Sequence, residues 1–195
     1  GTITANARGS AIITITSYNG IAKSITVYAY DSSNLPVLEP DSDVKGTAMQ
    51  GTFRVVFPLG SYQNYSVEYD HTLISDLTVD RTAEKQADTI TYTVAEIAEP
   101  TDTQIVLKNA AGTVLATYAL RALRAPKAGE VTLPENQREL VLGLGDNTQR
   151  ITPVCAENTL SDFKFTSDHP EYVSVDADTG VLNAAAVTPS GVYAT

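Results

Sequence analysis

The chain of 195 residues contains no tryptophan, two histidines and a single cysteine, Cys155. One cysteine excludes an internal disulfide, and it also excludes the usual zinc sites, which need several cysteine or histidine ligands. Because Cys155 lies between the small apolar residues Val154 and Ala156, we interpret it as a core residue rather than a nucleophile. The scarcity of cysteine and histidine leaves little material for catalysis or metal binding.

Basic residues are also few, with 13 lysines and arginines against 23 acidic residues and a net charge of −10. Nucleic acids and anionic membrane surfaces both bind proteins through basic surfaces. The excess of acidic residues therefore argues against both kinds of partner. We interpret the acidity as a means of keeping the protein soluble. The chain also lacks an apolar run of about 18 residues, so we expect no membrane insertion within this segment.

Neither His71 nor His169 lies in a metal-ligand spacing, and no Gly-x-Ser-x-Gly motif or phosphate-binding loop is present. Two acidic stretches, 41–46 and 176–180, partly match a calcium-binding loop. In the first, Lys45 takes a ligand position, and in the second Gly180 comes one residue too early, so we interpret both as turns. We therefore expect no enzyme activity, no cofactor and no metal.

Period-two alternation of apolar residues runs along nearly the whole chain, which is typical of strands. The Tyr18-Asn19-Gly20 sequence between two β-branched runs predicts a hairpin, and a second hairpin turn is predicted at 109–112. The best candidate for a helix is 82–88, a stretch that could as easily be a loop. The further predicted strands are 52–57, 65–69, 89–94, 104–108, 113–120, 139–144, 163–166, 172–175 and 180–183. The sequence predicts an all-β protein.

Two breaks divide the chain. The first, 31–46, is polar and contains Pro36 and Pro40, and the second, 121–129, contains Pro126 and Gly129. We therefore predict closing strands of one module at 1–30, a β-sandwich at 31–126, and a module lacking its last strands at 127–195. The middle segment has the size of an ordinary sandwich.

The C-terminal segment has a motif pattern of its own: Glu139-Leu-Val-Leu-Gly-Leu-Gly145, then an aromatic and serine-containing stretch from Phe163 through Val-Asp at 175–176 to Gly180-Val-Leu-Asn, then Gly191-Val-Tyr. With this pattern, residues 130–195 resemble a bacterial immunoglobulin-like domain of group 2. Such modules occur in extracellular bacterial adhesins and in some phage structural proteins. Phe165 stands where the family usually has tryptophan, so the resemblance implies a smaller core anchor.

Residues 1–30 resemble the closing strands of that same family, and aligning Gly1 with Gly180 gives an internal period of about 179 residues. The middle segment resembles the later strands of BACON domains, β-sandwiches of gut Bacteroidetes surface proteins that were first proposed to bind carbohydrate. An unassigned immunoglobulin-like sandwich is the alternative. The resemblances imply immunoglobulin-like β-sandwich domains in tandem.

The N-terminal hairpin would leave one apolar face and its edges uncovered if it stood alone. Three arrangements are open: docking on the middle sandwich, folding with residues 130–195 of the same chain, or completing the C-terminal module of another copy by strand addition. We expect it to pair with a sheet whose other strands come from distant sequence.

Ten tyrosines are the one compositional sign of binding, and Tyr62, Tyr65 and Tyr69 form a candidate ligand-binding cluster. The alternative is that these rings fill the sandwich and its strand pairs. The predicted function is a non-catalytic structural or adhesive segment of a bacterial cell-surface protein, or of a phage virion. Its partners would be neighbouring modules or copies and host or cell-surface proteins. The second hypothesis is a carbohydrate-binding module with glycan partners.

Overall fold

The computed structural model describes residues 2–7, 9–29, 34–58, 60–83 and 86–189. Its contacts divide the chain into two units, Gly1–Leu123 and Arg124–Thr195, and each is described by itself. The fold is all-β, as predicted, and the helical element among the described residues is the short 3-10 helix Glu135–Gln137. In these residues we find no helix of the length and apolarity that crossing a membrane requires.

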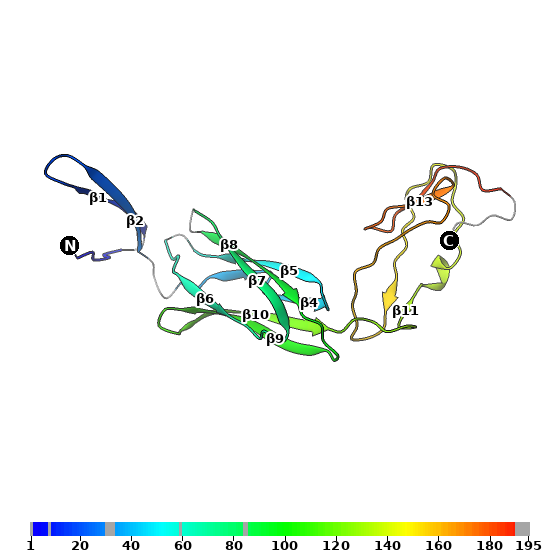
Figure 1. Cartoon of the computed structure of the whole chain (residues 1–195), viewed down its shortest axis with the longest axis horizontal. Helices are drawn as coiled ribbons and strands as arrows, with labels where there is room; N and C mark the ends of the chain where they lie inside the picture. Colours follow the sequence, from blue (N-terminus) through cyan, green and yellow to red (C-terminus); the bar gives the residue numbers. More distant parts are fainter. Residues whose placement is uncertain (1, 8, 30–33, 59, 84–85, 190–195) are drawn as a thin grey trace. The chain divides into compact units, whose positions relative to one another are not determined.

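The first two strands, β1 (Gly9–Thr16) and β2 (Ala22–Ala29), form the predicted hairpin (Figure 1). Ser17 N–H donates to the carbonyl of Ile21 at 2.9 Å, and Gly20 closes the turn with φ +83°, a conformation that favours glycine. The two strands form a sheet of their own. The expected pairing with strands from distant sequence is not found in the described part of the chain.

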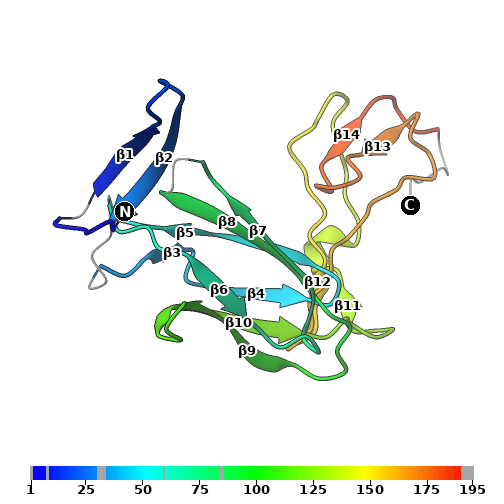
Figure 2. The ribbon, with the colours of Figure 1, turned by 60° about the vertical axis from the view of Figure 1, so that its left-hand side comes forward.

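The next eight strands form a sandwich of two four-stranded sheets, whose layers can be followed in Figure 2. The first sheet has the order β3-β5-β8-β7, with β3 at Val37–Glu39, β5 at Gln50–Val56, β8 at Ala87–Val94 and β7 at Ile74–Arg81. The second has the order β4-β10-β9-β6, with β4 at Ser42–Gly46, β10 at Val114–Leu123, β9 at Thr101–Asn109 and β6 at Tyr65–Glu68.

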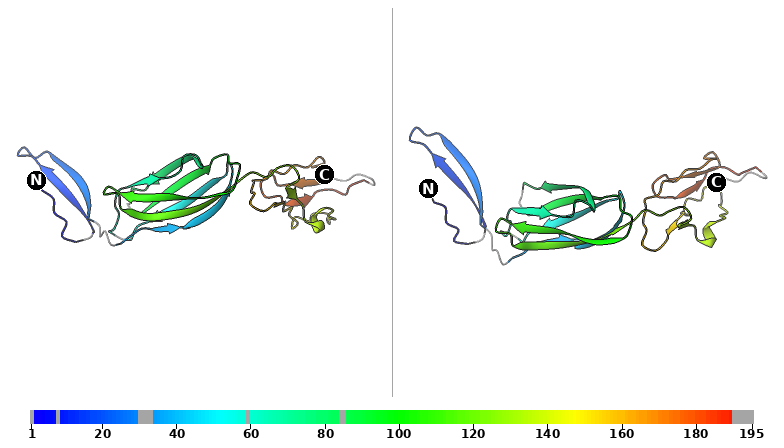
Figure 3. Two further views of the ribbon diagram at one scale, coloured as in Figure 1. Left: turned by 90° about the horizontal axis from the view of Figure 1, so that it is seen from below. Right: turned by 60° about the horizontal axis from the view of Figure 1, so that its bottom comes forward.

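This strand order is that of an immunoglobulin-like sandwich, in which the first, second, fifth and fourth strands face the third, sixth and seventh. Here the first strand is split between the two sheets. Its β3 part pairs with β5 in one sheet, and its β4 part pairs in parallel with β10, the last strand, in the other. A cis peptide bond joins Glu39 to Pro40 where the chain changes sheets. Figure 3 shows the sandwich strands running side by side along its length.

The sandwich core follows from the alternation along each strand. In β8 the side chains of Ile90, Tyr92 and Val94 point inward, and the threonines between them point outward. Between the sheets, Phe53 stacks on Tyr118 with ring centroids 4.0 Å apart. Gly51 leaves room for the ring of Tyr92, because a Cβ there would lie 2.2 Å from its Cζ.

Five of the predicted strands, at 52–57, 65–69, 89–94, 104–108 and 113–120, are confirmed as β5, β6, β8, β9 and β10. The interpretation of 31–46 as a polar break is wrong in part, because it contains β3 and β4, two short edge strands with few apolar residues. Strand β7 was not predicted, since a register shift between Ile74 and Asp76 interrupts its alternation. Of the two interpretations of 82–88, loop rather than helix describes residues 82, 83 and 86, and β8 begins at Ala87, while 84–85 lie outside the described residues.

In the second unit the strands are short. Strand β11 (Val131–Thr132) pairs with β12 (Val154–Cys155), and β13 (Val173–Val175) pairs with β14 (Leu182–Ala184). The strands expected at 172–175 and 180–183 are confirmed with shifted ends. The strands expected at 139–144 and 163–166 are wrong, because neither segment pairs as a strand among the described residues.

Local hydrogen bonds shape the loops of this unit. The guanidinium of Arg124 donates to both carboxylate oxygens of Glu130, at 2.7 and 2.8 Å, which lowers the pKa of Glu130 to about 2. The predicted turn at 176–180 is confirmed: Asp176 Oδ1 accepts the Thr179 N–H at 2.8 Å, and Gly180 has φ +70°. A Cβ on Gly180 would lie 2.9 Å from the ring of Phe165, so this ring packs directly over the glycine.

Candidate functional site

The structure places two of the three candidate binding tyrosines inside the sandwich. Tyr62 and Tyr65 are buried, so their ring faces contact the core and are not available to stack on a ligand. Tyr69 is half-buried at the end of β6, with its ring centroid 4.3 Å from that of His71. The three side chains therefore do not form one exposed surface, and the interpretation of Tyr62 and Tyr65 as a stacking platform is corrected.

A buried carboxylate explains why these tyrosines turn inward. Asp88 is 0% exposed, and its Oδ2 accepts hydrogen bonds from the hydroxyl of Tyr65 at 3.0 Å and from that of Tyr62 at 3.4 Å. Arg81 adds an ion pair to Asp88 at 3.4 Å and lies over the ring of Tyr65. Because a buried charge is costly unless it is paired and hydrogen-bonded, Asp88 fixes the positions of both phenols. Burial, reinforced by Asp88, raises the pKa of Tyr65 well above its usual value.

A second polar network links the two sheets. The hydroxyls of Tyr92 on β8 and Tyr118 on β10 lie 3.2 Å apart, and that of Tyr92 also donates to Asp43 Oδ2 on β4 at 3.3 Å. Burial raises the pKa of Tyr92 strongly, and the hydrogen bond to Tyr118 adds to this shift. Burial likewise raises the pKa of Tyr118 to about 12. These buried rings agree with the alternative interpretation, in which the tyrosines fill the interior of the sandwich.

The acidic stretches have structural roles. Residues 42–46 form strand β4, so 41–46 is neither a turn nor a calcium-binding loop. Asp176 Oδ1 accepts hydrogen bonds from Asp178 and Thr179 within its own turn. Among the described residues we find no cluster of three or more side chains suited to hold a metal. His169 Nδ1 lies 3.0 Å from Glu171 Oε1, within one surface loop.

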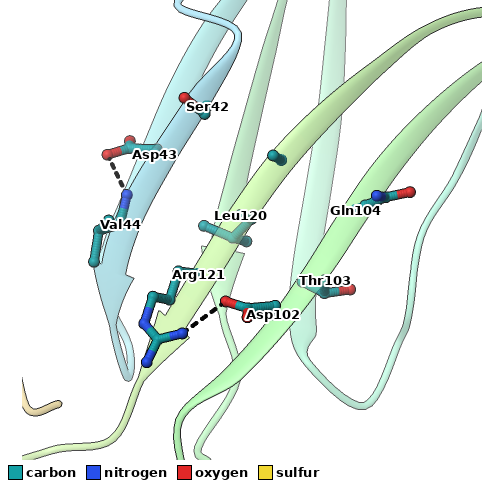
Figure 4. A pocket seen from close by; sticks show the side chains of 9 residues that line it. Ser42, Asp43, Val44, Asp102, Thr103, Gln104, Leu120 and Arg121 are labelled. Carbon is teal, nitrogen blue, oxygen red and sulfur yellow. Dashed lines mark hydrogen bonds and ion pairs between the residues drawn. The ribbon is translucent and has the colours of Figure 1, made fainter.

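A surface depression of about 690 Å³ lies over the outer face of β4, β10 and β9 (Figure 4). Its shape follows from the register. Ala119, which has only a methyl group, is flanked by Ser42 and Gln104, and in the next row Arg121 is flanked by Val44 and Asp102. Larger side chains thus surround a small one, which leaves the hollow.

The chemistry of this depression is polar. The guanidinium of Arg121 points toward Asp102 and donates to its Oδ1 at 3.0 Å, as Figure 4 shows. Gln104 and Ser42 add an amide and a hydroxyl, so donors and acceptors lie together in a form that suits a hydroxyl-rich ligand. The nine lining residues include no aromatic ring. Sequence reasoning missed this site because it depends on the pairing of β4 with β10.

Comparisons with known proteins give distant likenesses. The chain matches no family model, and no curated protein matches it significantly. Domains 4 and 5 of the S-layer protein SbsC align with a TM-score of 0.37 and 18% identity over 59% of this chain, which spans 58% of that structure. The titin domains Z1Z2, crystallised with telethonin, align with a TM-score of 0.33 and 15% identity over 78% of this chain and 83% of theirs.

A third structure is a Bacteroides ovatus surface protein, SGBP-B of a mixed-linkage glucan utilization locus, in complex with a mixed-linkage heptasaccharide. It aligns with a TM-score of 0.28 and 13% identity over 96% of this chain and 52% of its own. Scores this low leave the assignment of the fold to the strand order of the chain itself. That order identifies residues 37–123 as an immunoglobulin-like β-sandwich.

The buried phenols predict a loss of stability in alkali. An unfolded chain ionises tyrosine near pH 10, and the folded chain keeps Tyr65, Tyr92 and Tyr118 protonated to higher pH. The folded state then binds more protons, so the stabilisation is complete below pH 10. It falls from pH 10 toward 12, by about 1.4 kcal/mol per pH unit for each phenol.

The measurement is urea unfolding at several pH values between 8 and 12. Tyr92→Phe removes one buried phenol and should flatten the decline by about one third. Tyr18→Phe is the matched control, because Tyr18 is fully exposed and should leave the decline unchanged. Equal slopes for both variants would show that Tyr92 is not held protonated by the fold.

Proposed function

We propose that the chain is a non-catalytic structural segment of a bacterial cell-surface protein, in which the sandwich serves as a spacer that bears tension. The parallel pairing of β4 with β10 carries this proposal. Because Ser42–Gly46 runs in the same direction as 119–123, the chain enters the sandwich at one end of this pair and leaves at the other. A tandem protein built in this way extends by one sandwich length at each module.

The same pairing sets how the sandwich resists force. The N–H of Ala119 donates to the carbonyl of Asp41 at 3.1 Å, and the N–H of Thr47 donates to that of Leu123 at 3.0 Å. Pulling on the two ends slides β4 along β10, so the bonds of this ladder are loaded together. Strands that are peeled apart lose their bonds one at a time and separate at lower force.

The location that accompanies this proposal is the bacterial cell surface, with a phage virion as the alternative. It is supported by the resemblance of residues 130–195 to modules of bacterial adhesins and phage structural proteins. The net charge of −10 supports it as well, since a highly charged extended protein stays soluble.

Single-molecule pulling on the full chain tests the spacer. Ladder alternation points the N–H of Lys45 toward β10, like that of Thr47, whereas the N–H of Val44 is held by the Asp43 carboxylate at 2.8 Å. Lys45→Pro should therefore lower the unfolding force of the sandwich, because proline removes a ladder bond. Val44→Pro is the control on the free edge, where proline is tolerated, and should retain most of the force. A low force in the unmodified chain would contradict the proposal.

Carbohydrate binding is the second candidate function, and the polar depression over Ala119 is the observation that favours it. Glycans, in this case, bind by hydrogen bonds to Arg121, Asp102 and Gln104 rather than by stacking on tyrosine.

A glycan array followed by calorimetry checks this candidate. Ala119→Phe fills the hollow and should abolish binding, while Thr117→Phe, two residues away on the same outer face of β10, should leave it intact. An array without hits, or equal binding by both variants, would exclude the depression as a glycan site.

A further inference from the structure

We propose that the hairpin β1–β2 docks through its apolar face onto the second unit of another copy of this chain, so that copies associate head to tail. This inference rests on the proposed structural function, because it names the partner through which such segments join. The docking face consists of Ala11, Ile13 and Ile15 on β1 with Ile25 and Val27 on β2.

The register of the hairpin gathers these side chains. Ile13 lies opposite Ile25, Ala11 lies opposite Val27, and alternation places all of them on one side of the two-stranded sheet. Ile15 is 64% exposed. A lone hairpin is marginally stable in water, so a face of β-branched residues needs a cover.

The resemblance of the first residues of the chain to the segment that begins at Gly180 indicates which surface packs on the hairpin. Ile3 aligns with Leu182, and Ala5 aligns with Ala184, two residues that the second unit buries on β14. Ile3 is 54% exposed, whereas Leu182 is 7% exposed. The apolar residues of this pattern are therefore buried in the second unit, whereas Ile3 in the N-terminal segment is exposed to solvent. Because the N-terminal segment resembles a segment that is buried in the second unit, we infer that a second unit can pack against it.

Charge favours the same partner. The first 30 residues contain Arg8 and Lys23 and no acidic residue, whereas residues 124–195 contain ten acidic and five basic residues. A net charge of +2 on the hairpin segment meets a net charge of −5 on the second unit. Opposite charges attract the two parts and disfavour pairing of two hairpins with each other.

The second unit also offers an acceptor. The segment 139–144 has the alternation of a strand, yet it pairs with no strand among the described residues. Val141 is 94% exposed and Leu144 is 67% exposed. An apolar, unpaired segment of strand character can accept the edge of a hairpin by strand addition, and its side chains then extend the two faces of the hairpin. Because donor and acceptor are different surfaces, the contact is heterologous and repeats from copy to copy.

Sedimentation velocity of the full chain over a range of concentrations tests the proposal. We expect concentration-dependent association that weakens as salt is added. Ile13→Thr with Ile25→Thr keeps the β-branched shape of the hairpin and removes its apolar face, and each change should raise the Kd about tenfold. Ile12→Thr is the matched control, because Ile12 is exposed on the opposite face of the same strand.

Mixing two defective chains identifies the acceptor. Val141→Thr with Leu144→Thr damages the acceptor and leaves the hairpin intact, so this variant and the hairpin variant should each be monomeric alone. Together they should form a one-to-one complex, since one supplies a sound hairpin and the other a sound acceptor.

Three results overturn the proposal. The first is a monomeric unmodified chain at all concentrations. The second is association of the acceptor variant at full strength, which would indicate pairing of hairpins. The third is a mixture that stays monomeric. A failure here is distinct from failure of the spacer, because the pulling experiment reads only the sandwich.

Discussion

The pairing of β4 with β10 determines how the sandwich is closed and where its ends lie. By dividing its first strand, the chain places β3 at the edge of one sheet and β4 beside the last strand of the other. The core reinforces this pair, because the hydroxyl of Tyr92 reaches from the opposite sheet to Asp43 on β4 and also meets Tyr118 on β10. A break of this junction therefore disturbs both the inter-strand ladder and the buried polar contacts.

The tyrosines show how one residue type serves two demands at once. Their rings supply much of the core in a chain without tryptophan, while their hydroxyls satisfy buried acceptors such as Asp88. The sequence alone does not distinguish tyrosines that fill the core from tyrosines that bind a ligand at the surface. What separates the roles is Asp88, an acidic residue on an inward position of β8, where alternation otherwise places apolar side chains. An acid in such a position signals that nearby phenols turn inward.

The turns could be predicted from the sequence because they depend on neighbouring residues. The surface depression could not, because it depends on pairing between strands that are distant in sequence. Gly20 and Gly180 lie in turns with positive φ, and the short-range sequence around each was sufficient to locate them. Strand β4 depends on a partner that is distant in sequence, β10, and the register shift between Ile74 and Asp76 interrupts the alternation of β7. The depression over Ala119 depends on the register of three strands, so no sequence motif predicts it. The segment 139–144 carries a strand pattern but finds no partner, which is what the docking proposal addresses.

We expect β4 to remain attached to β10 until the whole sandwich unfolds. Native-state hydrogen exchange can measure this at the amides of Thr47 and Ala119, whose hydrogen bonds cross this pair. Both amides should exchange with the same free energy as the amide of Ile90, in the buried strand β8. Exchange of Thr47 and Ala119 well before Ile90 would show instead that β4 detaches on its own while the rest of the sandwich stays folded.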